Sequence, residues 1–151
     1  MSRGGTVVIG VGNPLRHDDG IGPVVAAAIA ARKLPGVRVV TCAGDPASLL
    51  DTWRDARLAV VVDALRTAPP APGRLHRLTA GQLAGGYATA SSHGFGVPAA
   101  FGLARALGQL PGRLIVIAVE AACTGPGAGL SPPVRGAVSA AVEAVLAEVR
   151  T

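Results

Sequence analysis

The chain of 151 residues contains few residues of several types, and each scarcity excludes some classes of protein. Its aromatic residues are one Trp, one Tyr and two Phe, so the core has to be built from Ala, Val, Leu and Ile. Two cysteines, Cys42 and Cys123, are too few for a disulfide framework, and we expect free thiols in a cytoplasmic protein. No apolar run reaches the roughly 18 residues of a membrane-spanning helix, so we expect no membrane span.

Motifs of several enzyme classes are missing as well. The chain has no HExxH helix of zinc proteases, no CxxC pair and no GxSxG nucleophile elbow, although two serines precede His93. The formal net charge is +5, but the arginines are scattered and aromatic residues are few, which argues against nucleic-acid binding. An acidic protein partner is compatible with this charge.

Strand and helix patterns alternate along the chain, which indicates one α/β domain over residues 1–151. Buried strands are predicted over residues 6–12, 37–41, 58–64 and 113–120, and a half-exposed strand over 74–78. Helices are predicted from residue 22, over 47–56 and 97–108, and from residue 132 onward. This order predicts three layers, α/β/α, around a mostly parallel, mixed sheet of about five strands.

Three polar residues are expected at one edge of this sheet. Asp19 follows the first strand, Asp63 ends the apolar run LAVVVDA, and His93 lies in a loop before the third helix. Ligands of such folds bind beyond the carboxyl ends of the strands, and a buried carboxylate without a partner is very costly. One imidazole and two carboxylates form a suitable ligand set for a first-row metal ion.

Each of these residues also has an ordinary structural explanation. Asp18 or Asp19 could cap the first helix, because acidic residues favour helix N-termini. Asp63 could accept hydrogen bonds from loop amides, and His93 could be an ordinary loop residue. The opening VVIGVGNPLRHDDGIGP does not fit a dinucleotide site, since Leu15 replaces the third glycine and no acidic residue follows the second strand.

Four segments, in this order and spacing, resemble the [NiFe]-hydrogenase maturation endopeptidases. They are GVGNPLRHDDGIGP (10–23), VVVDA (60–64), SSHGFG (91–96) and GLSPPV (129–134). The family removes a C-terminal extension from the hydrogenase large-subunit precursor after nickel has been inserted. The resemblance implies a phosphorylase/hydrolase-like fold and an enzyme that acts on this precursor. We expect a monomer without a tightly bound cofactor of its own.

The resemblance also implies roles for individual residues. Asp19, Asp63 and His93 would contact the nickel that the precursor carries, and Asp19 and Asp63 would be the catalytic residues. The peptide bond could be broken by water acting on a metal-polarised carbonyl, or with Asp19 or Asp63 as general base. The sequence leaves both routes open.

Substrate contacts are expected in two turns, at Gly12, Asn13, Gly44 and Asp45. The second turn departs from the family, because TCAGDPASLL stands where many members have a segment like Asp-Gly-Gly-Thr. His76, which alternates with its neighbours in RLHRL, is expected to face solvent.

Two other interpretations remain open at this stage. A non-catalytic nickel-recognition or assembly module on the same fold would keep the three ligands and the docking surface but would not cleave. A related acid-dependent peptidase would cleave a different protein substrate. Processing of a nickel-loaded precursor would distinguish both from the main interpretation.

Overall fold

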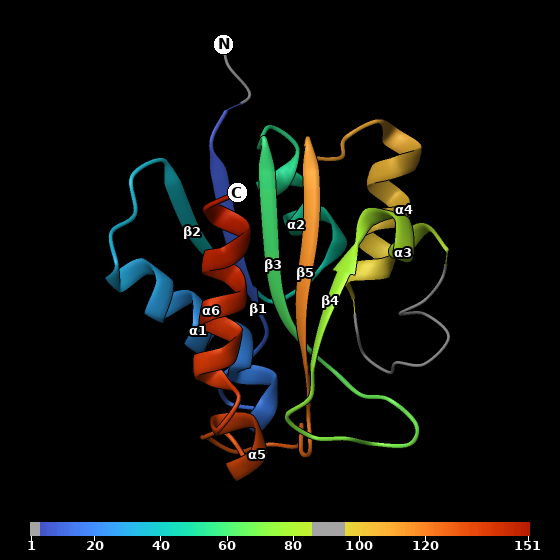
Figure 1. Ribbon diagram of the computed structural model, residues 1–151. Coiled ribbons are helices and arrows are strands. Elements are labelled where there is room, and N and C mark those ends of the chain that lie inside the picture. Colours follow the sequence, from blue (N-terminus) through green and yellow to red (C-terminus); the bar gives the residue numbers. More distant parts are fainter. Residues whose placement is uncertain (1–3, 86–95) are drawn as a thin grey trace.

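The computed structural model describes residues 4–85 and 96–151, in which a central sheet lies between helices (Figure 1). The strands are β1 (Thr6–Val11), β2 (Val37–Cys42), β3 (Leu58–Leu65), β4 (Leu75–Thr79) and β5 (Arg113–Glu120). The helices are η1 (His17–Gly20, a 3-10 turn), α1 (Ile21–Ala31), α2 (Pro46–Trp53), α3 (Ala80–Ala84), α4 (Val97–Leu107), α5 (Pro132–Arg135) and α6 (Val138–Val149). Every predicted strand is confirmed, with ends that differ by at most one residue.

The five strands form one sheet in the order β2-β1-β3-β5-β4. β2, β1, β3 and β5 are mutually parallel, and β4 runs antiparallel to β5. The predicted mixed, mostly parallel sheet is therefore confirmed. Because the four parallel strands share one direction, their carboxyl ends meet at the same edge, which is the lower edge in Figure 1.

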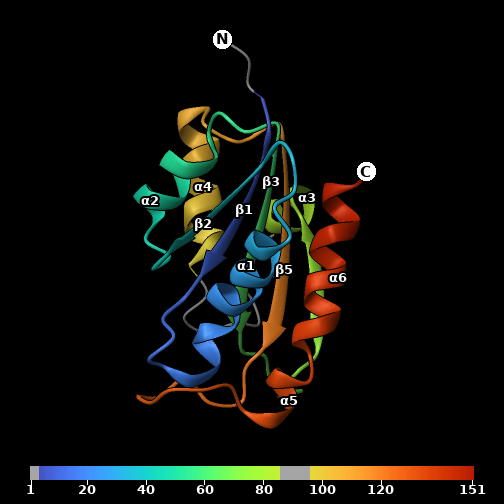
Figure 2. The same cartoon turned by 90° about the vertical axis from the view of Figure 1, so that its left-hand side faces the viewer.

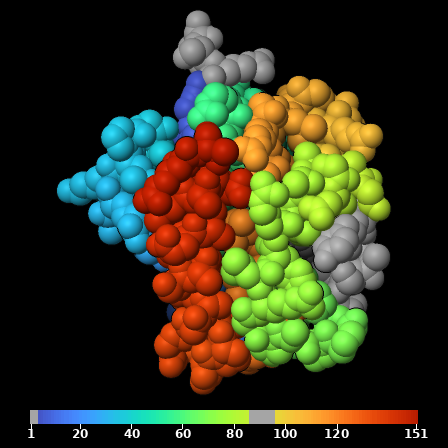
Figure 3. Space-filling model, in the orientation of Figure 1, coloured from blue at the N-terminus to red at the C-terminus, as the bar shows by residue number. Residues whose placement is uncertain are grey.

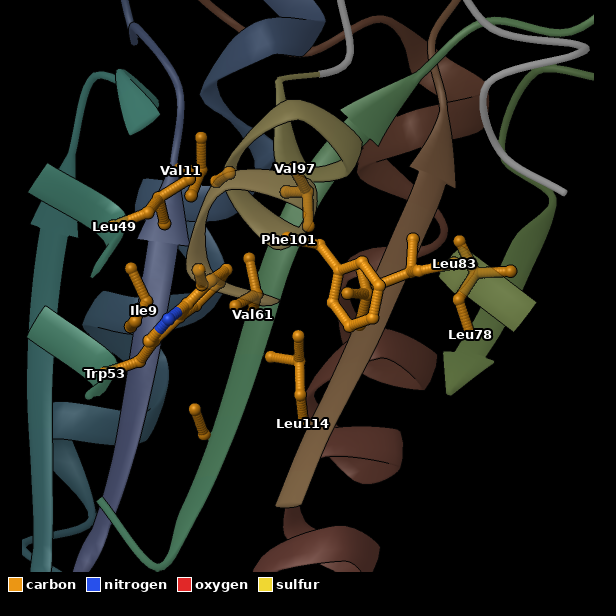
Figure 4. Close-up of a cluster of buried hydrophobic side chains, with 14 of the residues drawn as sticks. Ile9, Val11, Leu49, Trp53, Val61, Leu78, Leu83, Val97, Phe101 and Leu114 are labelled. Carbon is orange, nitrogen blue, oxygen red and sulfur yellow. The ribbon is translucent and has the colours of Figure 1, made fainter. Parts of the chain in front are cut away.

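Helices cover both faces of the sheet, which Figure 2 shows edge-on. α1 and α6 pack on one face over a cluster that includes Val60, Ile115 and Leu146, and α6 (red) runs lengthwise along this face in Figure 3. α2 and α4 pack on the other face, where Trp53 and Phe101 are the large side chains of the core (Figure 4). The three-layer α/β/α architecture is thus confirmed, and both halves of its core are mostly aliphatic.

Two glycines let α1 approach the sheet closely near the carboxyl edge. A Cβ on Gly22 would lie 2.2 Å from the carbonyl oxygen of Val11 and 2.6 Å from that of Val62. A Cβ on Gly10 would lie 2.4 Å from the carbonyl oxygen of Gly22. Any side chain at these positions would push the helix away from β1 and β3. The residues just before α1, including Asp19, are therefore held against the strand ends.

Three details differ from the sequence prediction. The helix predicted over 47–56 is α2, which ends three residues earlier at Trp53. The last predicted helix is two helices, because α5 ends where the amide of Ala137 donates to the carbonyl oxygen of Val134 and α6 starts afresh at Val138. The short α3 is an additional helix, nucleated by a capping box between Thr79 and Gln82. In the described part of the chain, no helix is long and apolar enough to cross a membrane.

Candidate active site

Asp63 lies at the carboxyl edge, near the end of the central strand β3. It is paired in register with Ala118 of β5, and strand alternation places its side chain on the same face as Val61, toward α2 and α4. Only 4% of the residue is exposed, and Oδ1 accepts a hydrogen bond from the amide of Ala64 at 2.8 Å. The expectation of a buried carboxyl at this strand end is confirmed.

The electrostatic surroundings of Asp63 favour its neutral form. Burial raises the pKa of Asp63 well above its ordinary value of 3.8, although the hydrogen bond from Ala64 acts in the opposite direction. The negative charge of Asp19 raises this pKa further, so the two carboxylates lie close enough to repel each other. A cation between them would remove both the repulsion and the cost of burying the charge.

Asp19 is held by the turn that follows β1. Its Oδ2 accepts a hydrogen bond from the amide of Asn13 at 2.8 Å. Gly12 has a φ of +138°, and a Cβ there would lie 1.8 Å from the carbonyl oxygen of Asp19, so only glycine fits. The helix-cap interpretation of Asp19 is wrong, because α1 begins after Gly20 without a side-chain cap. Substrate contact at Gly12 and Asn13 stays a prediction.

The neighbouring Asp18 is fully buried and points away from this pair. Its carboxylate accepts hydrogen bonds from the amides of Ala122 (2.8 Å) and Cys123 (3.0 Å) and from the amide and hydroxyl of Ser131 (both 2.7 Å). Burial alone would raise the pKa of Asp18, but these hydrogen bonds outweigh it and the pKa is lowered. Asp18 therefore anchors the loop after β5 and does not cap α1.

The turn between β2 and α2 lies at the same edge. Gly44 has a φ of +98°, and Asp45 caps α2 by accepting a hydrogen bond from the amide of Ser48 at 3.0 Å. Hydrogen bonding to Ser48 lowers the pKa of the Asp45 carboxyl. A Cβ on Gly96, just before α4, would lie 2.9 Å from the carbonyl oxygen of Gly44, so the start of α4 meets this turn. Substrate contact at Gly44 and Asp45 stays a prediction.

Cys42, at the end of β2, is unsuited to act as a nucleophile. Burial raises the pKa of its thiol, and the negative charges of Asp45 and Asp63 raise it further against the opposing hydrogen bond from Gly44. The nucleophilic form of cysteine is the thiolate, which this environment disfavours. The influence of Asp63 also shows that Cys42 borders the aspartate pair.

His93, the third predicted nickel contact, lies outside the described residues. The structure therefore brings together two of the three predicted ligands, Asp19 and Asp63. Within residues 4–85 and 96–151, no group of three or more His, Cys, Asp or Glu side chains could hold a metal ion.

The sequence prediction for His76 is wrong. His76 shares the inward face of β4 with Leu78, and its side chain is only 10% exposed. Its Nε2 lies 3.4 Å from Oε1 of Glu120, which also accepts a hydrogen bond from the hydroxyl of Thr67. Glu120 ends the apolar run RLIVIAVE just as Asp63 ends LAVVVDA. The argument that singled out Asp63 therefore applies equally to Glu120.

The family model for hydrogenase maturation protease, HycI, matches residues 23–148. The chain belongs to the hydrogenase maturation protease family. This match includes Asp63 and the position of His93, whereas Asp19 lies just before it. The role of Asp19 therefore depends on the geometry of the turn after β1.

Solved structures of related proteins have the same architecture as this protease. The hydrogenase maturating endopeptidase HybD from Escherichia coli is 27% identical with a TM-score of 0.79, over 97% of this chain and 92% of that chain. An endopeptidase from Escherichia coli is 26% identical with a TM-score of 0.83, over the same shares of 97% and 92%. The [NiFe] hydrogenase maturation protease HybD from Thermococcus kodakarensis, 21% identical over 96% of this chain and 99% of that chain, supports the fold alone with a TM-score of 0.78. No curated protein sequence matches the chain significantly. The protease is a hydrogenase maturation endopeptidase.

Proposed function

We propose that the protease removes the C-terminal extension of a [NiFe]-hydrogenase large-subunit precursor after nickel has been inserted. Asp19, Asp63 and His93 contact the nickel of the precursor, and Asp19 and Asp63 are the catalytic residues. The observation that carries this proposal is the burial of Asp63 near the end of β3, beside Asp19, whose charge raises the pKa of Asp63. A buried carboxyl group beside a second, partly exposed carboxylate is suited to receive a cation.

The chain path is compatible with a nickel contact at His93. This residue is separated by only three positions from Gly96, which meets Gly44 at the carboxyl edge. Three residues of extended chain span at most about 10 Å. The covalent chain thus does not prevent the proposed nickel contact of His93.

Asp63 has a defined part in the reaction. Without nickel, burial and the charge of Asp19 favour the protonated form of Asp63, because both raise its pKa. When the nickel-loaded precursor docks, the positive charge of nickel favours the carboxylate form of Asp63, and solvent water takes up any proton that Asp63 carries. The carboxylate formed in this way can accept a proton from the attacking water, which is the part of a general base. Nickel would polarise the scissile carbonyl if it lies next to it.

The nickel arrives with the substrate, and this explains how cleavage waits for metal insertion. Two carboxylates and one imidazole are mostly hard ligands and leave coordination positions open, whereas thiolate ligands in the precursor suit nickel better. A precursor without nickel lacks the contact that draws its tail to the aspartate pair. The protease itself then needs no resident cofactor. Its two free thiols are compatible with the cytoplasmic location predicted from the sequence.

The test is incubation of the purified protease with nickel-loaded and nickel-free precursor, followed by mass measurement of the large subunit. We expect loss of the tail from the nickel-loaded form only. Loss from both forms would contradict the dependence on nickel. Loss from neither, with retained binding of the nickel-loaded precursor, would favour a recognition module that does not cleave.

A further inference from the structure

Three arginines from different parts of the chain converge on one uncharged loop. Residues 121–131, which follow β5, contain no Lys, Arg, Asp or Glu. Arg16 Nε donates to the carbonyl oxygen of Thr124 at 3.0 Å, and a terminal guanidinium nitrogen of Arg66 donates to the Thr124 hydroxyl at 3.3 Å. Arg135 donates to the carbonyl oxygen of Leu130 at 2.9 Å. We call Arg16, Arg66 and Arg135 the cationic rim.

The positive charge of this rim is not neutralised by the protease itself. Each of the three arginines is exposed, and none forms an ion pair with another described residue. The carboxylate of Asp18, which is bonded to the same loop, is fully buried, and loop amides and Ser131 already occupy it. Each guanidinium uses one hydrogen bond to hold the loop and keeps further N–H groups free for an external acceptor.

A cleft of about 330 Å³ opens between the loop and η1. It is lined by His17, Cys123, Ala128, Gly129, Leu130, Ser131 and Arg135. No acidic side chain lines it, and the ring of His17 is fixed because its Nδ1 lies 3.0 Å from the carbonyl oxygen of Gly129. The cleft and the rim together form a surface whose polar groups suit carboxylates.

The rim borders the aspartate site. Arg16 precedes Asp19 by three residues, and Arg66 follows Asp63 by three residues. Figures 1 and 2 both place the loop after β5 (orange) at the lower edge, beside the blue segment that joins β1 to α1. The cationic rim therefore lies at the same edge of the sheet as the aspartate pair.

We propose that the cationic rim docks an acidic segment of the precursor next to the cleavage site. The inference rests on the proposed function, because it takes the large-subunit precursor as the substrate. Its physical basis is charge complementarity, since exposed rim charges accelerate encounter with an oppositely charged partner and fix its orientation. The net charge of +5 acts in the same direction at longer range.

Steady-state kinetics with the nickel-loaded precursor tests the rim. In the triple variant R16Q/R66Q/R135Q we expect KM to rise about tenfold at low ionic strength while kcat stays within about twofold. Because salt screens exposed charges, the difference in KM should close as ionic strength approaches about 0.5 M. The binding affinity for the same precursor, measured by calorimetry, should fall by the same factor.

Two matched variants separate this effect from other causes. R32Q/R105Q/R150Q removes the same net charge far from the loop and should leave KM within about twofold. R16K/R66K/R135K keeps the charge and should keep most of the affinity. If R32Q/R105Q/R150Q loses as much affinity as R16Q/R66Q/R135Q, net charge explains the effect and the proposal is overturned. If R16K/R66K/R135K binds as weakly as the glutamine variant, the arginines only support the loop, which also overturns the proposal.

The outcomes also distinguish the rim from the proposed function. Processing that is normal and equally salt-dependent in the glutamine variant would overturn the rim but leave the function intact. If the wild-type protease binds the precursor without cleaving it, the calorimetric comparison still decides for or against the rim. A wild-type protease that neither binds nor cleaves the precursor would overturn both.

Discussion

Two adjacent aspartates in this protease have opposite surroundings, and this difference decides their roles. Asp18 is saturated by four hydrogen-bond donors and has a lowered pKa. Asp19 accepts from the amide of Asn13 and faces the buried Asp63, whose pKa is raised. The carboxylate oxygens of Asp19 and Asp63 therefore keep lone pairs that a cation can bind.

We expect Asp63→Asn to abolish processing and to stabilise the isolated fold. The amide keeps the size of the side chain, but it can neither accept a proton from water nor neutralise the positive charge of nickel. The rate of tail removal should therefore fall at least about hundredfold. Because the pKa of Asp63 is raised on folding, wild-type stability falls as the pH rises from the unfolded value near 3.8 toward the folded value. Urea unfolding from pH 3 to 8 measures this.

The pH dependence supplies the control for that variant. The stability advantage of Asp63→Asn should be largest at neutral pH and should disappear near pH 3, where both side chains are neutral. An advantage that is independent of pH would show that relief of the buried charge is not its cause.

Asp18→Ala should lower the stability of the fold by about 3 kcal/mol, because it leaves buried loop amides without their acceptor. For a chain of this size this corresponds to a fall in Tm of roughly 6–12 °C. The pKa of Asp18 is lowered on folding, so its contribution is complete above the ordinary value of 3.8 and is lost as the pH falls through the folded value. Thermal unfolding at pH 7 and pH 2.5 should therefore show a smaller difference from wild type at the lower pH.

His93→Ala separates nickel contact from a structural role. If His93 contacts nickel, Tm should stay within about 2 °C of wild type while processing of the nickel-loaded precursor falls at least about tenfold. Tail removal and Tm are measured on the same preparation. A variant that melts normally and processes at the wild-type rate would remove His93 from the site.

At the scale of secondary-structure elements, the site depends on how closely α1 approaches the ends of β1 and β3. Glycines at positions 10 and 22 remove the side chains that would keep the backbones apart. The turn between β1 and η1 then places Asp19 close to Asp63. The absence of side chains at Gly10 of β1 and Gly22 of α1 thus allows the close packing that positions the site.

Gly22→Ala should destabilise the fold by about 3 kcal/mol, because the added Cβ would lie 2.2 Å from the carbonyl oxygen of Val11. Gly102→Ala in α4 is the matched control, since a Cβ there meets no atom within 4 Å. The control should stabilise the fold by about 0.5–1 kcal/mol through the higher helix propensity of alanine. Denaturant unfolding of both variants measures the two effects, and a neutral Gly22→Ala would contradict the close approach.

At the scale of the whole molecule, the carboxyl edge combines two opposite kinds of charge. Asp63 lies at the end of β3 on the face that α2 and α4 cover, with Asp19 in the turn after β1, while the three rim arginines are bonded to the loop that leads from β5 to α5. The first suits a metal ion and the second suits acidic side chains. Under the two proposals, the nickel of the precursor and its acidic segment would be bound at the same edge.

The isolated protease should retain little metal. Only three protein ligands are proposed, and two of them are carboxylates, so nickel should dissociate readily without the precursor. Elemental analysis after extensive dialysis against a metal-free buffer should find far less than one nickel or zinc per chain. Stoichiometric metal that survives dialysis would contradict delivery of nickel by the substrate.

The sequence by itself determined the strands, the sheet type and the burial of Asp63. Long apolar runs report burial on both faces of a strand, and an acid at the end of such a run has to lie at the sheet edge. The same local pattern misplaced His76, because alternation along a short strand does not say which of its two faces is covered.

Only the tertiary structure decided what binds the carboxylate of Asp18 and where the arginines gather. The carboxylate of Asp18 accepts hydrogen bonds from donors more than 100 residues along the chain, and Ser131 is separated from it by 113 positions. Arg16 reaches Thr124 across 108 positions. Side-chain hydrogen bonds of this range leave no periodic trace in a sequence, since they depend on how the layers pack and not on the local conformation of either segment.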